Sequence, residues 1–392
     1  MIILRGKVIT EEDVIEKGEV VIEKDKIIKV GKIKRLSLPS SKIFHIPKSI
    51  IVPGFIDIHM HGLGKYGPKG KENITGISYL EPHYGTTGFV PTLASATHQE
   101  YLKFLQDVKE VILNQPEKGA KVLGAHLEGP YINPKMKGGM DEEYLRLPRP
   151  EEYEELIKVG GRTLKIMTLS PELPGSIPLI KSLRQNGTVV SLGHSLATEN
   201  DLRKAMEAGL SHICHLFNAF PPEKPRELGV REPKLSDICL VTEGLTAEVI
   251  SDGIHVHPVM IRLAIKAMGL NNIVAMTDSM VGTGLSEGIY KMSDGRKFYT
   301  KKGDVARLVE DKRIIVGSIL TMNYALKNLV KKCGLSLLEA SKITSLNPAK
   351  VIGLDKEVGS IKVGKKANLA VLNADFECLL TFIEGKLVYQ KK

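Results

Sequence analysis

Residues 121–129, KVLGAHLEG, form a short apolar run without polar alternation, and the recurrence of such runs decides the fold. A run of this kind is typical of a strand that is buried on both faces of a parallel sheet. Segments with apolar residues at helical spacing separate the runs, for example EYLKFLQDVKEVIL at 100–113. The runs lie at 50–59, 86–95, 121–129, 162–170, 187–195, 210–218, 245–255 and 271–279. Eight strand–helix units predict an α/β fold, the (β/α)8 or TIM barrel; a doubly wound sheet is the alternative, but it seldom has eight such regular units.

The two ends of the chain share a pattern that differs from that of the central segment. Residues 2–9, 18–23 and 26–34 are short β-like runs joined by polar turns, and similar runs return after residue 355. We therefore predict one small β-sandwich domain that is formed by both termini. The predicted domains are residues 1–52 plus 355–392 for the β domain and residues 53–354 for the barrel.

Composition excludes several classes of protein. Of 392 residues, 42% are hydrophobic and 26% are charged, which is ordinary for a globular protein. No run of 18 apolar residues exists, so no membrane span is expected. The four cysteines, at 214, 239, 333 and 378, form no C-x-x-C pair, and we expect a reducing, cytoplasmic compartment.

The net charge of +10 comes from lysines that are dispersed among glutamates. Aromatic residues make up 5% of the chain and tryptophan is absent, so the sequence has no basic–aromatic platform for nucleic acid. A solvated charged surface is the preferred interpretation. An anionic substrate is second and nucleic acid a distant third.

Polar residues gather where the predicted strands end, and in a barrel the active site lies at the carboxyl ends of the strands. A single histidine at a strand end is more often a packed core residue than a ligand. A set that converges from six strands is better explained by a metal centre. The set comprises Asp57, His59, His61, His126, Glu128, His194, His212, His215, Asp252, His255, His257 and Asp278.

Glu128, His194 and His215 would give two imidazoles and one carboxylate, which leaves a fourth position on a divalent metal for water. Such a metal lowers the pKa of its water to about 7, and a nearby carboxylate can then take the proton. Asp278 is the candidate base, with a helix N-cap as the alternative role. His59 and His61 alternate on one strand and can face the same side. They either hold a second metal, bridged by Glu128, or form hydrogen bonds around the first.

The glycine loop Gly62-x-Gly64-x-x-Gly67 follows a strand and resembles a dinucleotide fingerprint. The match is poor, because no clean helix start and no acidic residue at the end of a second strand follow it. We interpret it as a mobile loop over the barrel mouth. A nicotinamide-dependent redox enzyme and a basic nucleic-acid binder are the competing classes of function.

Several segments together resemble one family, the N-acetylglucosamine-6-phosphate deacetylases of the amidohydrolase superfamily. The resemblance spans nearly the whole chain in order and implies a barrel with a small β domain. It also implies metal-dependent removal of the acetyl group from N-acetylglucosamine 6-phosphate, which gives glucosamine 6-phosphate and acetate. The segments are PGFIDIHMHG (53–62), GAHLEGPYINPKMKGG (124–139), GHS (193–195), HLFNAF (215–220), DGIHVHP (252–258), TDSM (277–280), VGSILTM (316–322) and NPAKVIGLDKEVGSIKVGKKANLAVL (347–372).

Matched residue by residue, Glu128, His194 and His215 correspond to the family's metal ligands and Asp278 to its catalytic aspartate. Members that keep the strand-one histidines, as this chain does, can bind two ions. The resemblance implies one or two divalent ions per chain, with zinc preferred and iron, cobalt or manganese as alternatives. It also implies substrate contacts at Gly139, Met140, Asn218, Ala219, His255, Ile315, Val316 and Gly317.

Two departures from the family stand out. Met140 occupies the place where the family often has histidine or glutamine, and a methionine cannot donate a hydrogen bond to the substrate. Either a second metal does that work, or the substrate is another N-acetylated amino-sugar phosphate or a different amide. The phosphate arginine is Arg226 or Arg231, with a slight preference for Arg231 because of its REP flank. In the family this arginine reaches the neighbouring site of a homodimer.

Overall fold

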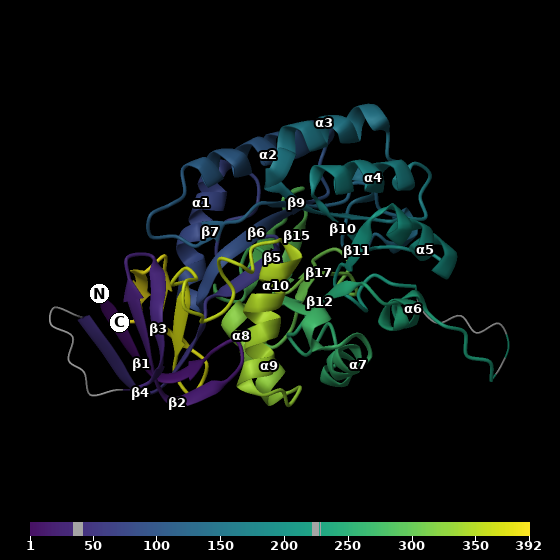
Figure 1. Ribbon diagram of the computed structural model, residues 1–392. Coiled ribbons are helices and arrows are strands. Elements are labelled where there is room, and N and C mark those ends of the chain that lie inside the picture. Colours follow the sequence, from purple (N-terminus) through teal and green to yellow (C-terminus); the bar gives the residue numbers. More distant parts are fainter. Residues whose placement is uncertain (34–41, 222–226, 228) are drawn as a thin grey trace.

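The computed structural model describes residues 1–33, 42–221, 227 and 229–392 (Figure 1). Its centre is a parallel barrel of eight strands in the order β13-β12-β11-β10-β9-β8-β6-β5, with the short β7 (Lys121–Val122) paired to β6. This confirms the predicted (β/α)8 barrel. Backbone hydrogen bonds from Asp278 N to His59 O (2.9 Å) and from His61 N to Ser279 O (2.7 Å) link the first and last strands at their carboxyl ends. The barrel strands are β5 (Phe55–Met60), β6 (Thr86–Ala94), β8 (Ala125–Glu128), β9 (Leu164–Leu169), β10 (Val189–Leu192), β11 (Leu210–Ile213), β12 (Thr246–Ile250) and β13 (Ile273–Met276).

Helices surround the barrel, and their starts follow from local sequence. Thr97 and Thr198 cap α2 and α5. Each threonine side chain accepts a hydrogen bond from the backbone N–H of the residue three positions later, and the carboxylate of that residue accepts one from the backbone N–H of the threonine. None of the described helices is both long and apolar enough to cross a membrane. The helices are α1 (Lys71–Leu80), α2 (His98–Leu113), α3 (Pro150–Gly160), α4 (Ser176–Asn186), α5 (Glu199–Ala208), α6 (Leu235–Val241), α7 (Pro258–Met268), α8 (Met322–Lys331), α9 (Leu337–Ser341) and α10 (Asn347–Val351).

Both ends of the chain build one further sheet of seven strands, in the order β20-β19-β18-β4-β1-β2-β3. In Figure 1 both the N- and the C-terminus lie on this sheet, β1 in its interior and β20 at one edge. Leu4 and Val20 from the first strands share an apolar core with Phe382 from the end of the chain, and this agrees with the predicted small β domain. The exact domain boundaries stay a prediction. The strands are β1 (Ile2–Ile9), β2 (Val14–Glu23), β3 (Lys26–Lys32), β4 (Lys42–Pro53), β18 (Leu369–Leu372), β19 (Cys378–Ile383) and β20 (Lys386–Gln390).

Residues 50–53 belong to β4 and not to the first barrel strand, which begins at Phe55. The continuous apolar run at 50–59 is therefore two strands in two sheets. Both are buried, so hydrophobicity alone does not separate them.

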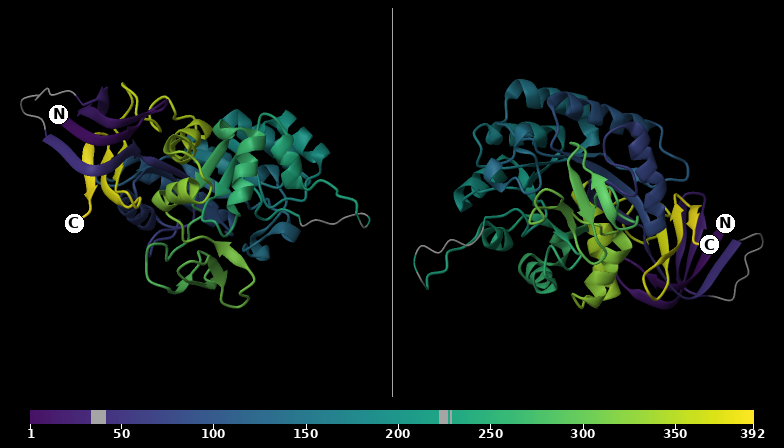
Figure 2. Two further views of the ribbon diagram at one scale, coloured as in Figure 1. Left: turned by 90° about the horizontal axis from the view of Figure 1, so that it is seen from below. Right: turned by 180° about the vertical axis from the view of Figure 1, so that it is seen from behind.

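A four-stranded antiparallel sheet, which we did not predict from the sequence, is inserted along the chain between β13 and α8 (Figure 2). It consists of β14 (Gly288–Lys291), β15 (Lys297–Thr300), β16 (Ala306–Leu308) and β17 (Ile315–Gly317). Its small core contains Met280 and Phe298, with Met292 and Val316 packed against them. We call it the inserted sheet. Its strands are only three or four residues long, which is too short for a clear periodic signal.

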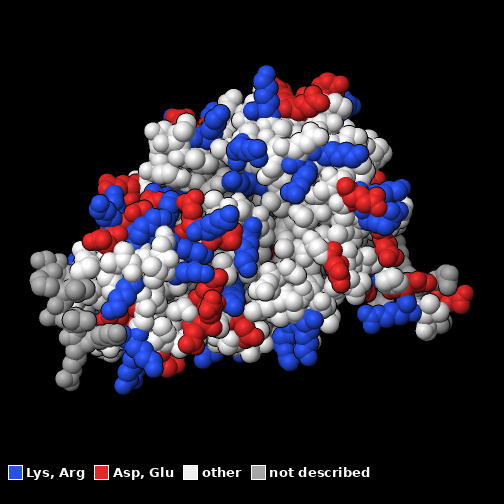
Figure 3. Space-filling model, in the orientation of Figure 1, with Lys and Arg blue, Asp and Glu red and all other residues white. Residues whose placement is uncertain are grey.

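Charged residues of both signs are interspersed on the face drawn in Figure 3. This distribution agrees with the preferred interpretation of the net charge as a solvated surface.

Candidate metal centre and active site

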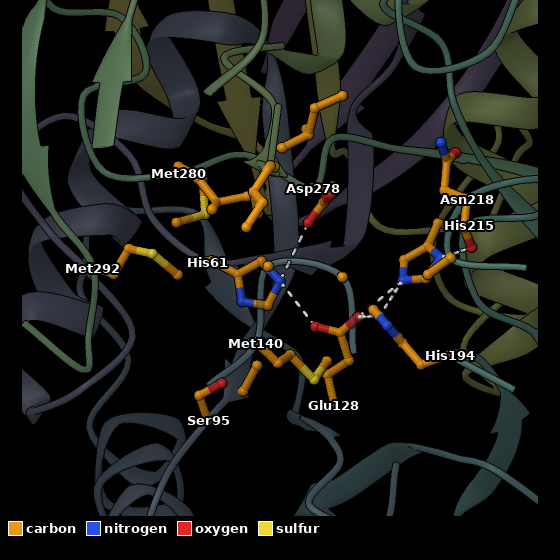
Figure 4. A pocket seen from close by; sticks show the side chains of 18 of the residues that line it. His61, Ser95, Glu128, Met140, His194, His215, Asn218, Asp278, Met280 and Met292 are labelled. Atoms are coloured by element: carbon orange, nitrogen blue, oxygen red, sulfur yellow. Dashed lines mark hydrogen bonds and ion pairs between the residues drawn. The ribbon is translucent and has the colours of Figure 1, made fainter. Parts of the chain in front are cut away.

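The carboxyl ends of the barrel strands meet in a cavity of about 410 Å³ (Figure 4). Strands β5, β8 and β10 to β13 each bring polar side chains to this end of the barrel. His194, His215 and Asp278 have φ angles of 51°, 25° and 50°, a backbone region that non-glycine residues seldom adopt. Strained residues persist where the surrounding structure holds them, and they cluster at functional sites. The predicted residues that line the cavity are His61, Glu128, Gly139, Met140, His194, His215, Asn218, Ala219, His255, Asp278, Ile315, Val316 and Gly317.

One group of donor atoms surrounds Oε1 of Glu128. Nε2 of His194 lies 3.1 Å from this oxygen and Nε2 of His215 lies 3.0 Å from it, while the two nitrogens are 3.0 Å apart. The Nδ1 atoms face backbone carbonyls, that of Met136 at 2.8 Å and that of Asn218 at 3.1 Å. A carbonyl only accepts, so each Nδ1 carries the proton and each Nε2 presents a lone pair. Two lone pairs and a carboxylate oxygen at such distances repel one another unless a cation lies among them. The three residues therefore fit a divalent metal.

A second group surrounds the other oxygen of the same carboxylate. Nε2 of His61 lies 3.2 Å from Oε2 of Glu128, 3.2 Å from Oδ1 of Asp278 and 3.2 Å from Nε2 of His59. Here too the Nδ1 atoms have acceptors: Glu248 Oε2 for His59 at 3.0 Å and Thr92 O for His61 at 3.2 Å. The same reasoning applies, so this group also fits a cation, and Glu128 lies where it can bridge two ions.

The electrostatics of both groups favour positive charge. Burial would raise the pKa of Glu128, but His59, His194 and His215 hold it well below its usual range. Burial would lower the pKa of His61, but its hydrogen bonds to Asp278 and Glu128 raise it to about 9, so its Nε2 carries a proton that a bound metal ion would displace. The carboxylates thus stay ionised and attract a cation to this buried centre.

The structure excludes one of the two roles considered for Asp278. No helix begins directly after it, since the next helix along the described chain, α8, begins at Met322, so the N-cap alternative is wrong. Its side chain is 13% exposed and its Oδ1 faces His61, which leaves the carboxylate accessible from the cavity.

Sequence reasoning missed Glu248, which is fully buried in β12. Its Oε2 faces Nδ1 of His59 and its Oε1 lies 3.2 Å from Nε2 of His212. It therefore orients His59, while His212 lies in a supporting position away from the cavity. The signal was the single glutamate inside the otherwise apolar run LTAEVI.

The other strand-end residues have supporting contacts. His126 lies 2.8 Å from Oγ1 of Thr168, and Asp57 accepts a hydrogen bond from Thr277. Oδ2 of Asp252 lies 2.6 Å from Nδ1 of His255 and fixes that ring. His257 caps α7.

Cys214 was also missed: its Sγ lies 3.8 Å from Glu128 Oε1, beneath the centre. Ser95, Met280 and Met292 line the cavity too, and nothing in their spacing had pointed to it.

The glycine loop is not a free flap. The backbone N–H of Gly64 donates to Thr283 O (2.9 Å), and Ser279 Oγ donates to Gly62 O (2.8 Å). These bonds fasten the loop to the segment after β13, whereas the helix that follows, α1, begins only at Lys71. The geometry of a dinucleotide site, with a helix that starts at the glycines, is therefore absent from this described loop.

The predicted phosphate arginines lie away from the cavity or outside the described residues. Arg226 is outside them. Arg231 has a side chain that is 78% exposed, 3.8 Å from Asp237, and it does not line the cavity. Among the described lining residues, Arg313 is the one lysine or arginine, and Asp311 pairs with it at 2.7 Å.

Comparisons with known proteins agree with this geometry. Residues 50–388 match the Amidohydrolase family. The N-acetylglucosamine-6-phosphate deacetylase of Bacillus subtilis (strain 168) is 34% identical over 392 residues, which cover 98% of this chain and 96% of that protein. The N-acetylgalactosamine-6-phosphate deacetylase of Escherichia coli O157:H7 is 30% identical over 340 residues, 86% of this chain and 87% of that one.

Among solved structures, a mutant of N-acetyl-D-glucosamine-6-phosphate deacetylase from Mycobacterium smegmatis, in complex with N-acetyl-D-glucosamine-6-phosphate, superposes with a TM-score of 0.90. It is 27% identical to this chain, and the match covers 99% of both chains.

Proposed function

The chain belongs to the amidohydrolase family and, within it, to the N-acetylglucosamine-6-phosphate deacetylases, and we propose how its residues carry out that reaction. The enzyme hydrolyses N-acetylglucosamine 6-phosphate to glucosamine 6-phosphate and acetate. The observation that carries the proposal is the convergence of imidazole Nε2 atoms on both oxygens of Glu128, with Asp278 at the edge of the cavity.

Glu128, His194 and His215 would hold the more tightly bound metal, and His59, His61 and Asp278 would hold a second one with Glu128 between them. A divalent metal bound there polarises the amide carbonyl and lowers the pKa of a water molecule. We propose zinc, with iron, cobalt or manganese as alternatives, because imidazole and carboxylate ligands accept all four.

Asp278 acts as the general base and acid. Its carboxylate accepts a proton from the water that attacks the acetyl carbon. It returns that proton to the amide nitrogen as the C–N bond breaks, so acetate and the free amine leave. Support comes from His61 and His59, which keep the pKa of Asp278 low although burial and the charge of Glu128 raise it, so that the carboxylate is ionised before the substrate arrives.

The sugar ring is bound on the side of His194 and His215. Asn218, Ala219 and His255 offer an amide, backbone groups and an imidazole there, and Asn218 Nδ2 donates to the carbonyl of His255 (3.3 Å). Gly139, Ile315, Val316 and Gly317 form the opposite wall. Because Met140 has no donor, polarisation of the carbonyl falls to the metal centre in this chain.

Binding of the 6-phosphate needs a cationic side chain. Among the described residues that line the cavity of one chain, the only lysine or arginine is Arg313, and Asp311 already balances its charge. We propose that Arg231, or Arg226 in the undescribed segment, reaches the cavity of a second copy in a homodimer. Exposed apolar side chains on α6 and α7 support contact with that copy: Val241 is 79% exposed, Val259 54% and Leu263 43%. We also expect the cytoplasm as its compartment, since the four cysteines are unpaired.

The decisive assay measures amine and acetate release from N-acetylglucosamine 6-phosphate, its galactosamine epimer and the unphosphorylated sugars, together with metal analysis. We expect release from the glucosamine phosphate, loss of activity on chelation, and recovery when a divalent ion is returned. Failure to release amine from that substrate in the metal-replete enzyme would contradict the function.

A further inference from the structure

The cavity has two chemically different sides, separated by the metal centre. In Figure 4 Asn218 lies beyond His215 on one side, whereas Met280 and Met292 lie beyond His61 on the other. Met140 lies near Glu128 and Ser95, below the centre in the same view. We call the apolar side, together with the adjoining Met140, the methionine wall and define it as Met140, Met280, Val281, Met292 and Val316, all of which line the cavity.

The methionine wall is part of a packed structure and not a chance gathering of side chains. Met280 is 5% exposed and belongs to the core of the inserted sheet, against which Val281, Met292 and Val316 pack. The loop that carries Met140 lies directly on β17, since a Cβ on Gly139 would come within 3.0 Å of Cγ1 of Val316.

Arg296 fastens that loop to the inserted sheet. Its Nη2 donates to the carbonyl of Gly139 at 2.7 Å, while Asp294 pairs with the same guanidinium at 2.7 Å. The inserted sheet therefore supplies one wall of the reaction cavity.

The two sides orient an N-acyl sugar phosphate. The acyl carbon bears two substituents that point in different directions: the nitrogen, which carries the sugar, and the alkyl group. If the hydroxylated ring and its phosphate lie on the side of Asn218 and His255, the alkyl group lies against the methionine wall. This division matches polar groups with polar groups and the apolar methyl group with apolar side chains.

Resting on the proposed function, we propose that the methionine wall is the acyl subsite and that the enzyme also hydrolyses amino-sugar 6-phosphates with longer N-acyl chains, such as N-propionyl and N-butyryl. The reaction keeps the same balance: water adds to the acyl carbon, the C–N bond breaks, and the corresponding fatty acid and glucosamine 6-phosphate leave.

Two features favour longer chains over a strict acetyl preference. Methionine is unbranched and adapts its rotamers to the shape of a ligand, so Met140, Met280 and Met292 can yield where a rigid wall would not. Moreover, Met140 has no strong hydrogen-bonding group that a longer alkyl chain would cut off from water, whereas a glutamine or histidine there would lose its solvation.

The test compares kcat/KM for the N-acetyl, N-propionyl and N-butyryl derivatives of glucosamine 6-phosphate, measured by amine release. A tight acetyl pocket rejects each additional methylene by roughly tenfold or more, hence roughly hundredfold for butyryl. We expect the butyryl value to lie within about tenfold of the acetyl value. A larger loss overturns the proposal.

Variants locate the effect. Met292→Phe fills the methionine wall from a half-buried position, so the fold should tolerate it, and we expect the butyryl-to-acetyl ratio of kcat/KM to fall at least about tenfold. Met140→Gln should lower the same ratio. Met268→Phe, in α7 and outside the cavity lining, is the matched control and should leave the ratio unchanged.

An unchanged ratio in both wall variants overturns the assignment of the subsite. Absence of activity on the acetyl substrate would instead refute the proposed function, so the two failures are distinguishable.

Discussion

Oε2 of Glu128 lies 3.2 Å from Nε2 of His61, whereas Oε1 of the same carboxylate faces His194 and His215. One carboxylate thus serves two sets of imidazoles. Both sets direct their Nε2 atoms inward, because their Nδ1 atoms are held by carbonyls or by Glu248. This relationship motivates the predictions about the metal centre.

Replacing the base should remove catalysis and leave the tighter metal in place. We expect Asp278→Asn to lower kcat by about 10²–10⁴-fold, because proton transfer is lost. Metal content at Glu128, His194 and His215 should stay near that of the wild type. Steady-state kinetics and elemental analysis measure the two effects, with Asp311→Asn, outside the cavity lining, as the control. Activity within tenfold of the wild type would refute the assignment.

The number of bound ions follows from the two sets of imidazoles. We expect up to two ions per chain in the metal-replete enzyme, one in His61→Asn, and none held tightly in Glu128→Gln, which removes the shared carboxylate. Elemental analysis after gel filtration gives the counts. Equal metal content in the wild type and His61→Asn would rule out the second ion.

Glu248 should affect metal affinity without touching the substrate. Glu248→Gln weakens the hold on Nδ1 of His59, and the loss of such supporting partners typically costs about 10–100-fold in metal affinity. Competition with a chelating dye measures this. His257→Gln, at the cap of α7, is the control, and equal affinities in the two variants would contradict the role of Glu248.

Glu81 should make the stability of the protein depend on pH. Burial, and then the charge of Asp57, raise its pKa to about 8. The folded state thus keeps a proton that the unfolded chain releases near the ordinary pKa of 4.5. Stability should therefore fall as the pH rises between these two values, by up to about 1.4 kcal/mol per pH unit.

Because glutamine cannot ionise, Glu81→Gln should have a flatter profile of Tm against pH, with a higher Tm than the wild type at pH 8. Thermal melts from pH 5 to pH 8 test this, with the exposed Glu243→Gln as the control. Parallel profiles for Glu81→Gln and the wild type would show that Glu81 does not titrate in this range.

Arg231 should contribute to recognition of the phosphate. We expect Arg231→Ala to raise KM for N-acetylglucosamine 6-phosphate about tenfold or more, since a bidentate charge-assisted pair contributes roughly 1.5–3 kcal/mol. The unphosphorylated sugar should show no such change. Arg313→Ala, which removes a cation already balanced by Asp311, is the comparison. If Arg231→Ala leaves KM unchanged, Arg226 is the remaining candidate.

The barrel and the members of its centre could be predicted from the order of residues along the chain. Eight buried runs with helices between them require parallel strands, and the carboxyl ends of such strands must meet. His59, His61, Glu128, His194, His215 and Asp278 could therefore be predicted to come together from their position in each run alone. Hydrophobic period, and the position of a polar residue at the end of a strand, can be read from the local sequence. The barrel then brings these strand ends together in space.

The surroundings of that centre depend on contacts between distant segments of the folded chain. Glu248 looked like part of an ordinary strand, and its role depends on His59, 189 residues away in the chain. The short strands of the inserted sheet become a wall only because Met280 and Phe298 pack between them, and Arg296 reaches across 157 positions to Gly139. Such contacts arise from packing between distant segments, for which neither spacing nor hydrophobic period leaves a local trace.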